Sequence, residues 1–214
     1  MLFVHGLWMT GAESLLMRRR LAAHGWRLVV LPYSSLAESM DSVARRCATQ
    51  AQIIARRTLQ PVHLLGHSLG GLVIFRAFEM GLLPAGRFSG EYCRVVFLGS
   101  PVRGSQSARA LAQYGPVRPM LGQMGRSYLP QGVAPRWSFE PQLGLIAGTR
   151  PFGLGRLLGS FNGPNDGTVA VAETRLEGAA DHCEVSVTHT GLTMSAEVAD
   201  QVACFLDSGS FIHH

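Results

Sequence analysis

The chain has 214 residues, of which 47% are hydrophobic and 15% are charged, and its formal net charge is +5 at pH 7. This composition excludes an intrinsically disordered chain, and the length fits a single domain over residues 1–214. No stretch reaches the roughly 18 consecutive apolar residues of a membrane span. No charged segment followed by an apolar one marks a signal peptide either, so we expect a cytoplasmic protein.

Positive charge and cysteine usage limit the partners. All 19 basic residues are arginine, and they are scattered except for the clusters 18–20, 45–46 and 56–57. Each cluster falls on an expected helix and fits a solvated face, so we expect no nucleic-acid partner. Peripheral contact with a lipid surface and the oligomeric state stay open. The four cysteines form no Cys-x-x-Cys pair, so we expect no metal and no cofactor, and three of them fit small core positions.

Strands and helices are expected to alternate along the chain. Short apolar runs rich in β-formers predict strands at 2–5, 27–31, 62–65, 95–98, 143–147 and 184–187. Helical periodicity predicts helices over about 12–24, 39–58, 69–80 and 194–206. This alternation predicts an α/β fold with a mostly parallel six-stranded sheet and helices on both faces.

Residues 101–141 interrupt the alternation. They are rich in Gly, Pro, Arg and Met, and only 105–113 has a weak helical pattern. Long irregular insertions in a compact domain are often functional. Two interpretations stay open: a lid-like insertion that covers a substrate pocket, and a passive surface excursion.

A serine lies between two glycines where a predicted strand turns into a predicted helix. The stretch Gly66-His67-Ser68-Leu69-Gly70-Gly71 follows the apolar run 62–65 and matches the Gly-x-Ser-x-Gly pattern in its expected context. The glycines allow a strained turn and a close approach of neighbouring chain. We therefore expect the Ser68 hydroxyl to stand clear of the sheet at a helix N-terminus.

A serine hydroxyl needs a base to accept its proton and a third group to orient that base. His189 follows the last predicted strand, at the carboxyl edge where the loops of a parallel sheet gather. His182 precedes that strand and is expected to be a solvent-exposed residue at the opposite edge. Asp166 lies in a turn after the fifth strand and gives the chain order Ser, Asp, His.

Two backbone amides would complete such a site by binding the oxyanion of a tetrahedral intermediate. The N–H of Leu69 directly follows the serine. The N–H of Leu7 lies in the loop His5-Gly6-Leu7-Trp8 after the first strand.

Four motifs in this order resemble those of bacterial α/β-hydrolases of the lipase and esterase type. They are His5-Gly6-Leu7-Trp8, the serine motif 66–71, Pro164-Asn165-Asp166-Gly167-Thr168-Val169 and His189-Thr190-Gly191-Leu192. The resemblance implies a Ser68–His189–Asp166 triad, with the Leu7 and Leu69 amides as oxyanion hole, that acts on carboxylic esters. The chain starts too late for the first two strands of the usual fold, so it resembles the minimal six-stranded form without a large cap.

The expected substrate is a small acyl ester or a lipid, with a short- to medium-chain acyl group. We expect Trp8 and Met9 on one side of the acyl pocket and Val169 and Leu192 on the other. A thioesterase or an acyltransferase with the same triad stays open, as does a non-catalytic binding protein of this fold. Ser68 at the turn, where a haloalkane dehalogenase has Asp, argues against that activity.

Overall fold

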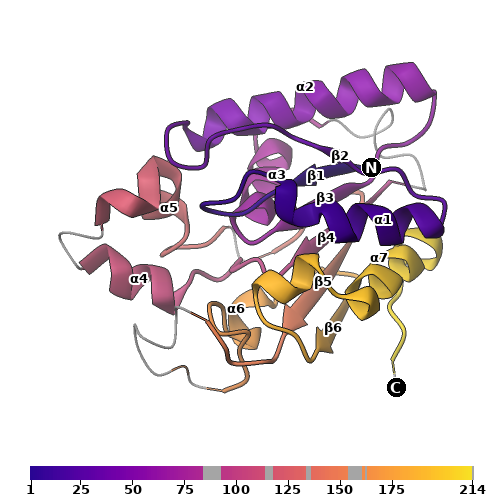
Figure 1. The fold of residues 1–214 in the computed structure, drawn as a ribbon. Helices are drawn as coiled ribbons and strands as arrows, with labels where there is room; N and C mark the ends of the chain where they lie inside the picture. The colour runs from indigo at the N-terminus through magenta and orange to yellow at the C-terminus, as the bar shows by residue number, and fades with distance from the viewer. Residues whose placement is uncertain (84–92, 114–117, 134–135, 154–160, 162, 214) are drawn as a thin grey trace.

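The computed structural model of the chain describes residues 1–83, 93–113, 118–133, 136–153, 161 and 163–213. Six parallel strands form one sheet in the order β2-β1-β3-β4-β5-β6 (Figure 1). The strands are β1 (Leu2–Val4), β2 (Val29–Val30), β3 (Leu64–His67), β4 (Arg94–Leu98), β5 (Gln142–Gly148) and β6 (Asp181–Val185). The predicted fold class is confirmed.

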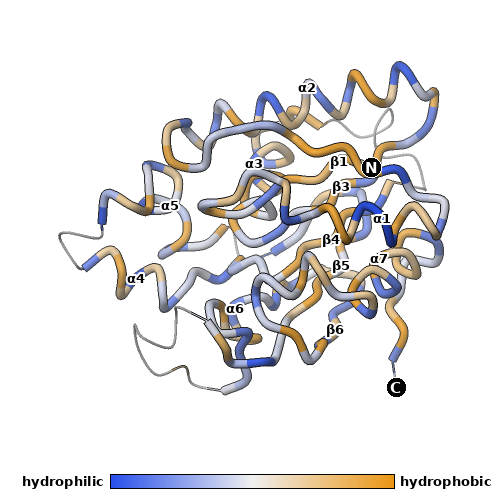
Figure 2. The backbone as a smooth tube through the Cα atoms, viewed as in Figure 1, coloured by the Kyte–Doolittle hydropathy of each residue, from blue (hydrophilic) through white to orange (hydrophobic). Residues whose placement is uncertain are grey.

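Helices cover both faces of the sheet (Figure 1). On one face α2 (Met40–Thr58) packs on α3 (Leu69–Glu79), and on the other α1 (Leu15–Ala23) packs on α7 (Ala196–Ser208). Neighbouring strand residues alternate between the two cores: Leu64 is buried against the α2–α3 face and Leu65 against the α1–α7 face. Figure 2 shows apolar strands in the centre and polar stretches along the outer helices.

The last strand differs from the prediction. β6 begins at Asp181 and ends at Val185, whereas the expected strand was 184–187. β6 is the edge strand, and such a strand can carry the half-buried polar residues Asp181 and His182, which hid it from an apolar pattern. His182 therefore lies within the strand, not in front of it, and its ring is within 3.1 Å of the Thr174 hydroxyl.

Residues 101–133 contain more helix than expected. The described parts form α4 (Gln106–Gln113), the 3-10 helix η2 (Arg118–Leu121) and α5 (Gly122–Tyr128), while 114–117 and 134–135 lie outside the described residues. Figure 1 shows α4 and α5 together at one end of the molecule. The other short helices among the described residues are η1 (Ala12–Ser14), α6 (Val171–Thr174) and η4 (Thr190–Thr193).

The cysteines are all free, and three are buried as expected: Cys47, Cys93 and Cys183. Burial raises the pKa of each of these three thiols to about 12, while Cys204 on α7 is half-exposed. Within the described residues, no helix has the length and apolar character needed to cross a bilayer.

Candidate active site

Ser68 occupies a strained turn between β3 and α3. Its backbone has φ 53° and ψ −121°, a conformation that is unusual for a residue with a side chain. A methyl group on Gly66 would lie 2.6 Å from the Gly71 backbone, and one on Gly70 would lie 2.0 Å from the Val4 carbonyl oxygen. The glycines of the motif are therefore required by the close packing of α3 on β1 and β3.

Asp166 and His189 come together from the loops that follow β5 and β6. Asp166 Oδ2 lies 2.6 Å from His189 Nδ1, and both side chains are buried. The other carboxylate oxygen accepts hydrogen bonds from the N–H groups of Thr168 at 2.9 Å and Val169 at 2.7 Å. The His189 N–H also donates to the Asp166 carbonyl at 2.9 Å. Side-chain and backbone contacts thus fix the pair, with Asp166 as acceptor.

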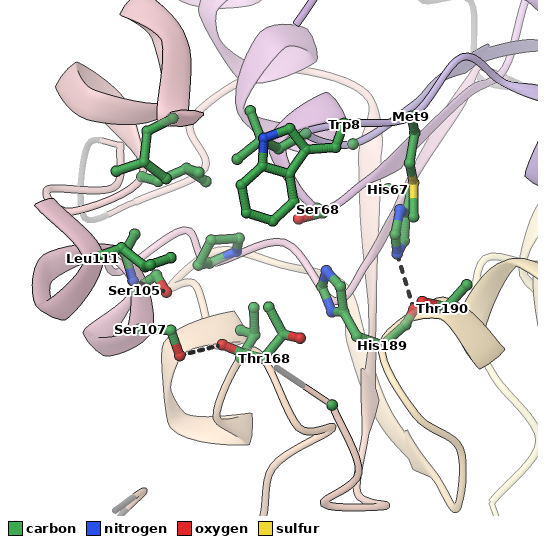
Figure 3. A pocket seen from close by; sticks show the side chains of 18 of the residues that line it. Trp8, Met9, His67, Ser68, Ser105, Ser107, Leu111, Thr168, His189 and Thr190 are labelled. Carbon is green, nitrogen blue, oxygen red and sulfur yellow. Dashed lines mark hydrogen bonds between the residues drawn. The ribbon is translucent and has the colours of Figure 1, made fainter. Parts of the chain in front are cut away.

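A cavity of about 690 Å³ brings Ser68 and His189 together. The Ser68 hydroxyl oxygen and the His189 ring both face it (Figure 3). With Nδ1 directed at Asp166, the ring presents its other nitrogen for exchange with a nucleophile or a leaving group. No described residue hydrogen-bonds the Ser68 hydroxyl.

The two expected oxyanion donors, the N–H groups of Leu69 and Leu7, lie on different elements. Leu69 is the first residue of α3, so its N–H has no acceptor in a preceding turn, while its side chain is buried in the core. Leu7 lines the cavity, on the loop between β1 and η1. The N–H of the next residue, Trp8, donates a hydrogen bond to the Ser35 hydroxyl at 3.0 Å.

Three of the four expected pocket residues line the cavity, and Leu192 does not. Trp8 and Met9 approach from the loop after β1, and Val169 from the loop that carries Asp166. Leu192 is fully buried in the α1–α7 core, close enough to block any side chain at Gly99. Residues 101–133 contribute Pro101, Ser105, Ser107, Ala108, Leu111, Met120, Leu121 and Leu129.

The sequence profile of the alpha/beta hydrolase family matches residues 1–203. The chain belongs to this family. No curated protein sequence matches it significantly.

Solved structures with the same fold include several enzymes. A Bacillus licheniformis lipase, BlEst2 in its mature form, superposes with a TM-score of 0.71 at 20% identity over 96% of this chain and 89% of the lipase. Phospholipase PlaB from Legionella pneumophila has a TM-score of 0.62 at 16% identity over 81% of this chain and 45% of its own. The thioesterase RedJ from Streptomyces coelicolor has a TM-score of 0.58 at 13% identity over 95% of this chain and 88% of its own. At these identities the likeness concerns the fold, and family membership supports a hydrolase.

Two glycines outside the motifs make room for the Asp166 carboxylate in this alpha/beta hydrolase. A methyl group on Gly148, at the end of β5, would lie 2.7 Å from Asp166 Cβ. A methyl group on Gly99, after β4, would lie 3.1 Å from Asp166 Oδ2 and 3.2 Å from His189 Nδ1. Sequence reasoning missed both, because their role depends on contacts between separate strands.

His67 joins the serine turn to the histidine loop. Its Nε2–H donates to the His189 carbonyl at 3.0 Å, and its Nδ1 is buried with no partner among the described residues. Burial lowers the pKa of His67 well below its usual value, and the nearby His189 lowers it further, so the ring stays neutral. His67 is therefore a fixed donor that holds the His189 backbone, a role that its place in the motif does not reveal.

Glu173 links the 101–133 segment to the Asp166 loop of the hydrolase. Its carboxylate accepts from the N–H groups of Gln106 at 2.6 Å and Ala170 at 2.9 Å. Burial raises the pKa of Glu173, and these two backbone donors lower it in part. The N-terminus of α4 and the chain just after Val169 are thus held by one buried side chain.

Proposed function

We propose that this hydrolase cleaves carboxylic esters, with Ser68 as nucleophile, His189 as general base and Asp166 as the group that orients and stabilises the imidazole. The observation that carries the proposal is the buried Asp166–His189 pair, whose histidine lines the same cavity as Ser68 on its strained turn. A base oriented by a carboxylate beside a serine is the arrangement that acyl transfer requires.

The reaction would proceed in two halves. Ser68 attacks the ester carbonyl carbon while His189 takes its proton, and the Leu7 and Leu69 N–H groups bind the oxyanion. Collapse of this intermediate breaks the ester C–O bond, with the proton passing from His189 to the leaving alcohol. Water then attacks the acyl-enzyme in the same way and releases the acid.

The cavity favours a neutral, apolar acyl group. Its lining among the described residues contains aliphatic and aromatic side chains, hydroxyl groups and the two histidines, but no Arg, Asp or Glu. A charged acyl group would lose its hydration here without gaining an ion pair. We therefore propose short- to medium-chain acyl esters as substrates.

The decisive experiment compares the wild type with Ser68→Ala on p-nitrophenyl esters from acetate to palmitate. We expect turnover to vanish in the variant and an optimum at short to medium chain length in the wild type. Asp166→Asn should keep the fold and lower kcat by about 10⁴-fold, because the imidazole would be held in the wrong tautomer. Turnover retained in Ser68→Ala would refute the proposed nucleophile. Faster turnover of acyl thioesters, or of esters only when an acceptor alcohol is added, would instead indicate a thioesterase or an acyltransferase.

We also propose an anionic lipid surface as a peripheral partner. Residues 92–165 contain eight arginines and one acidic residue, Glu140. Near the cavity, Arg118, Arg126 and Arg150 are exposed and form no ion pair with the described residues. Met120 and Phe152, which line the cavity, are 55% and 76% exposed. Apolar side chains among unpaired arginines match the chemistry of an anionic membrane surface.

A further inference from the structure

Trp8 connects the loop after β1 to the 101–133 segment. Its indole Nε1–H donates to the Met120 carbonyl at 2.7 Å, across 112 positions of sequence. The side chain is 46% exposed, so burial in the core does not explain its orientation. Its backbone φ of 60° is strained for a residue with a side chain, and the surrounding contacts must hold it there.

A second hydrogen bond anchors the same residue to the body of the protein. The Trp8 N–H donates to the hydroxyl of Ser35, which is buried and outside the cavity lining. The N–H of the next residue, Met9, donates to the Gly6 carbonyl at 3.4 Å. Both of these amides are engaged, whereas the N–H of Leu7, which lines the cavity, has no hydrogen-bond acceptor among the described residues.

Residues 118–128 rest directly on this loop and on the chain beside Ser35. Gly122, with φ 61°, approaches so closely that a methyl group there would lie 2.7 Å from Leu36 Cα. A methyl group on Gly125 would lie 3.6 Å from Leu7 Cδ1. The segment that borders the cavity therefore lies close to the side chain of the residue whose N–H is the expected oxyanion donor.

We propose that Trp8 is a positioning residue. Its hydrogen bond to the Met120 carbonyl attaches residues 118–128 to the loop after β1 and thereby holds the Leu7 N–H toward the oxyanion. This inference rests on the proposed ester hydrolysis. Oxyanion donors act by being preorganised, and small displacements of such groups cost large factors in rate. Loss of the Trp8–Met120 hydrogen bond should lower kcat even for an ester too small to reach the apolar wall of the cavity.

The test compares Trp8→Phe with the control Trp26→Phe. Phenylalanine keeps an aromatic side chain at position 8 but has no N–H for the Met120 carbonyl. Trp26 lies outside the cavity lining, and its indole N–H has no partner in the described residues, so the control removes a group that makes no bond. On p-nitrophenyl acetate we expect kcat to fall about tenfold in Trp8→Phe, with KM changed less than twofold, and no change in Trp26→Phe.

Hydrogen exchange supplies a readout that needs no turnover. Amides of residues 118–128 should exchange faster in Trp8→Phe than in the wild type or the control, also on a Ser68→Ala background. Ser35→Ala removes the backbone anchor without altering the indole, and it should lower kcat for acetate in the same way. An unchanged kcat, unchanged exchange, or an effect limited to KM for long-chain esters would overturn the positioning role of Trp8. Absence of ester turnover in the wild type would instead refute the proposed function, and hydrogen exchange would still test whether Trp8 holds residues 118–128.

Discussion

His67 shows how one buried side chain can support the residue proposed as general base. Because its Nε2–H bonds to the backbone of His189, His67→Phe should release that loop while keeping a ring of similar size. We expect kcat for p-nitrophenyl acetate to fall about tenfold, since a misplaced base is costly. The free energy of unfolding should change by about 1 kcal/mol, because only one hydrogen bond is lost.

His67→Gln is the matched variant, because its amide N–H can reach the same carbonyl. If one N–H donor to the His189 carbonyl is sufficient, this variant should retain kcat within about threefold of the wild type. The rate at which a fluorophosphonate labels Ser68 gives a second measure of base position. Equal rates in both variants and the wild type would contradict the assigned role.

The local signals at single residues carried most of the site hypothesis. The spacing of Gly66, Ser68 and Gly70 predicts the strained turn, because the whole pattern lies within five residues, although the close approach of Gly70 to the Val4 carbonyl forms only after folding. The order of Asp166 and His189 follows from motif and strand order alone. Gly148 and the Trp8–Met120 bond could not be predicted, because each depends on segments that meet only after folding.

At the scale of elements, Glu173 joins α4 to α6 and the Asp166 loop. Glu173→Ala would leave the buried N–H of Ala170 and the partly buried N–H of Gln106 without their acceptor. We expect a loss of about 2–4 kcal/mol in the free energy of unfolding, measured by urea denaturation, because each unsatisfied buried donor costs about 1–3 kcal/mol. A lower kcat should accompany it, since Asp166 shares the loop.

Glu177→Ala is the control at this scale. Glu177 and its partner Arg136 are both about two-thirds exposed, and such surface pairs contribute little. Its free energy of unfolding should stay within about 0.5 kcal/mol of the wild type. If the two variants were equally stable, the link between α4 and the Asp166 loop would have to be abandoned.

Element prediction succeeded where burial dictates periodicity and failed where it does not. α2 was expected at 39–58 and spans Met40–Thr58, because one face packs on α3 and the other meets water. β6 was displaced by three residues at its start because an edge strand accepts polar residues. Residues 101–133 lack a strong pattern, because their short helices rest on the cavity rim rather than on the sheet.

For the whole molecule, buried histidines make stability depend on pH. Burial lowers the pKa of His63 to about 4, and it also lowers those of His67 and His182. The unfolded chain therefore takes up protons near the usual pKa of 6.5, while the folded protein takes them up only at lower pH. The free energy of unfolding should fall as the pH drops from about 7 toward 4, by up to about 3 kcal/mol for His63 alone.

Urea denaturation at pH 7.5, 5.5 and 4.5 would measure this slope. His63→Gln keeps an acceptor for the Arg94 N–H, which His63 Nδ1 accepts at 3.0 Å, but it cannot titrate. The free energy of unfolding of this variant should depend less on pH. At pH 4.5 it should therefore be higher, relative to the wild type, than at pH 7.5. An identical slope in both proteins would show that His63 does not titrate on unfolding.

Vesicle binding tests the charge distribution of the whole molecule. We expect Ser68→Ala protein to sediment with phosphatidylglycerol vesicles but not with phosphatidylcholine vesicles, and salt should weaken the binding. Replacing Arg118 and Arg126 by Gln should weaken it by about thirtyfold, because each arginine near an anionic surface contributes about 1 kcal/mol. The same change at Arg56 and Arg57, exposed on α2, is the control. If the two double variants lost vesicle binding equally, the binding would depend on net charge alone and not on a defined surface near the cavity.

The cysteines give this chain a built-in attachment point. With three thiols buried, a maleimide should react first at Cys204 on α7. That helix lies on the α1–α7 face of the sheet, and Cys204 is not among the residues that line the cavity. A fluorophore or a surface tether could therefore be coupled to the native sequence at one site, leaving the cavity mouth free for substrate and for single-molecule observation on a supported bilayer.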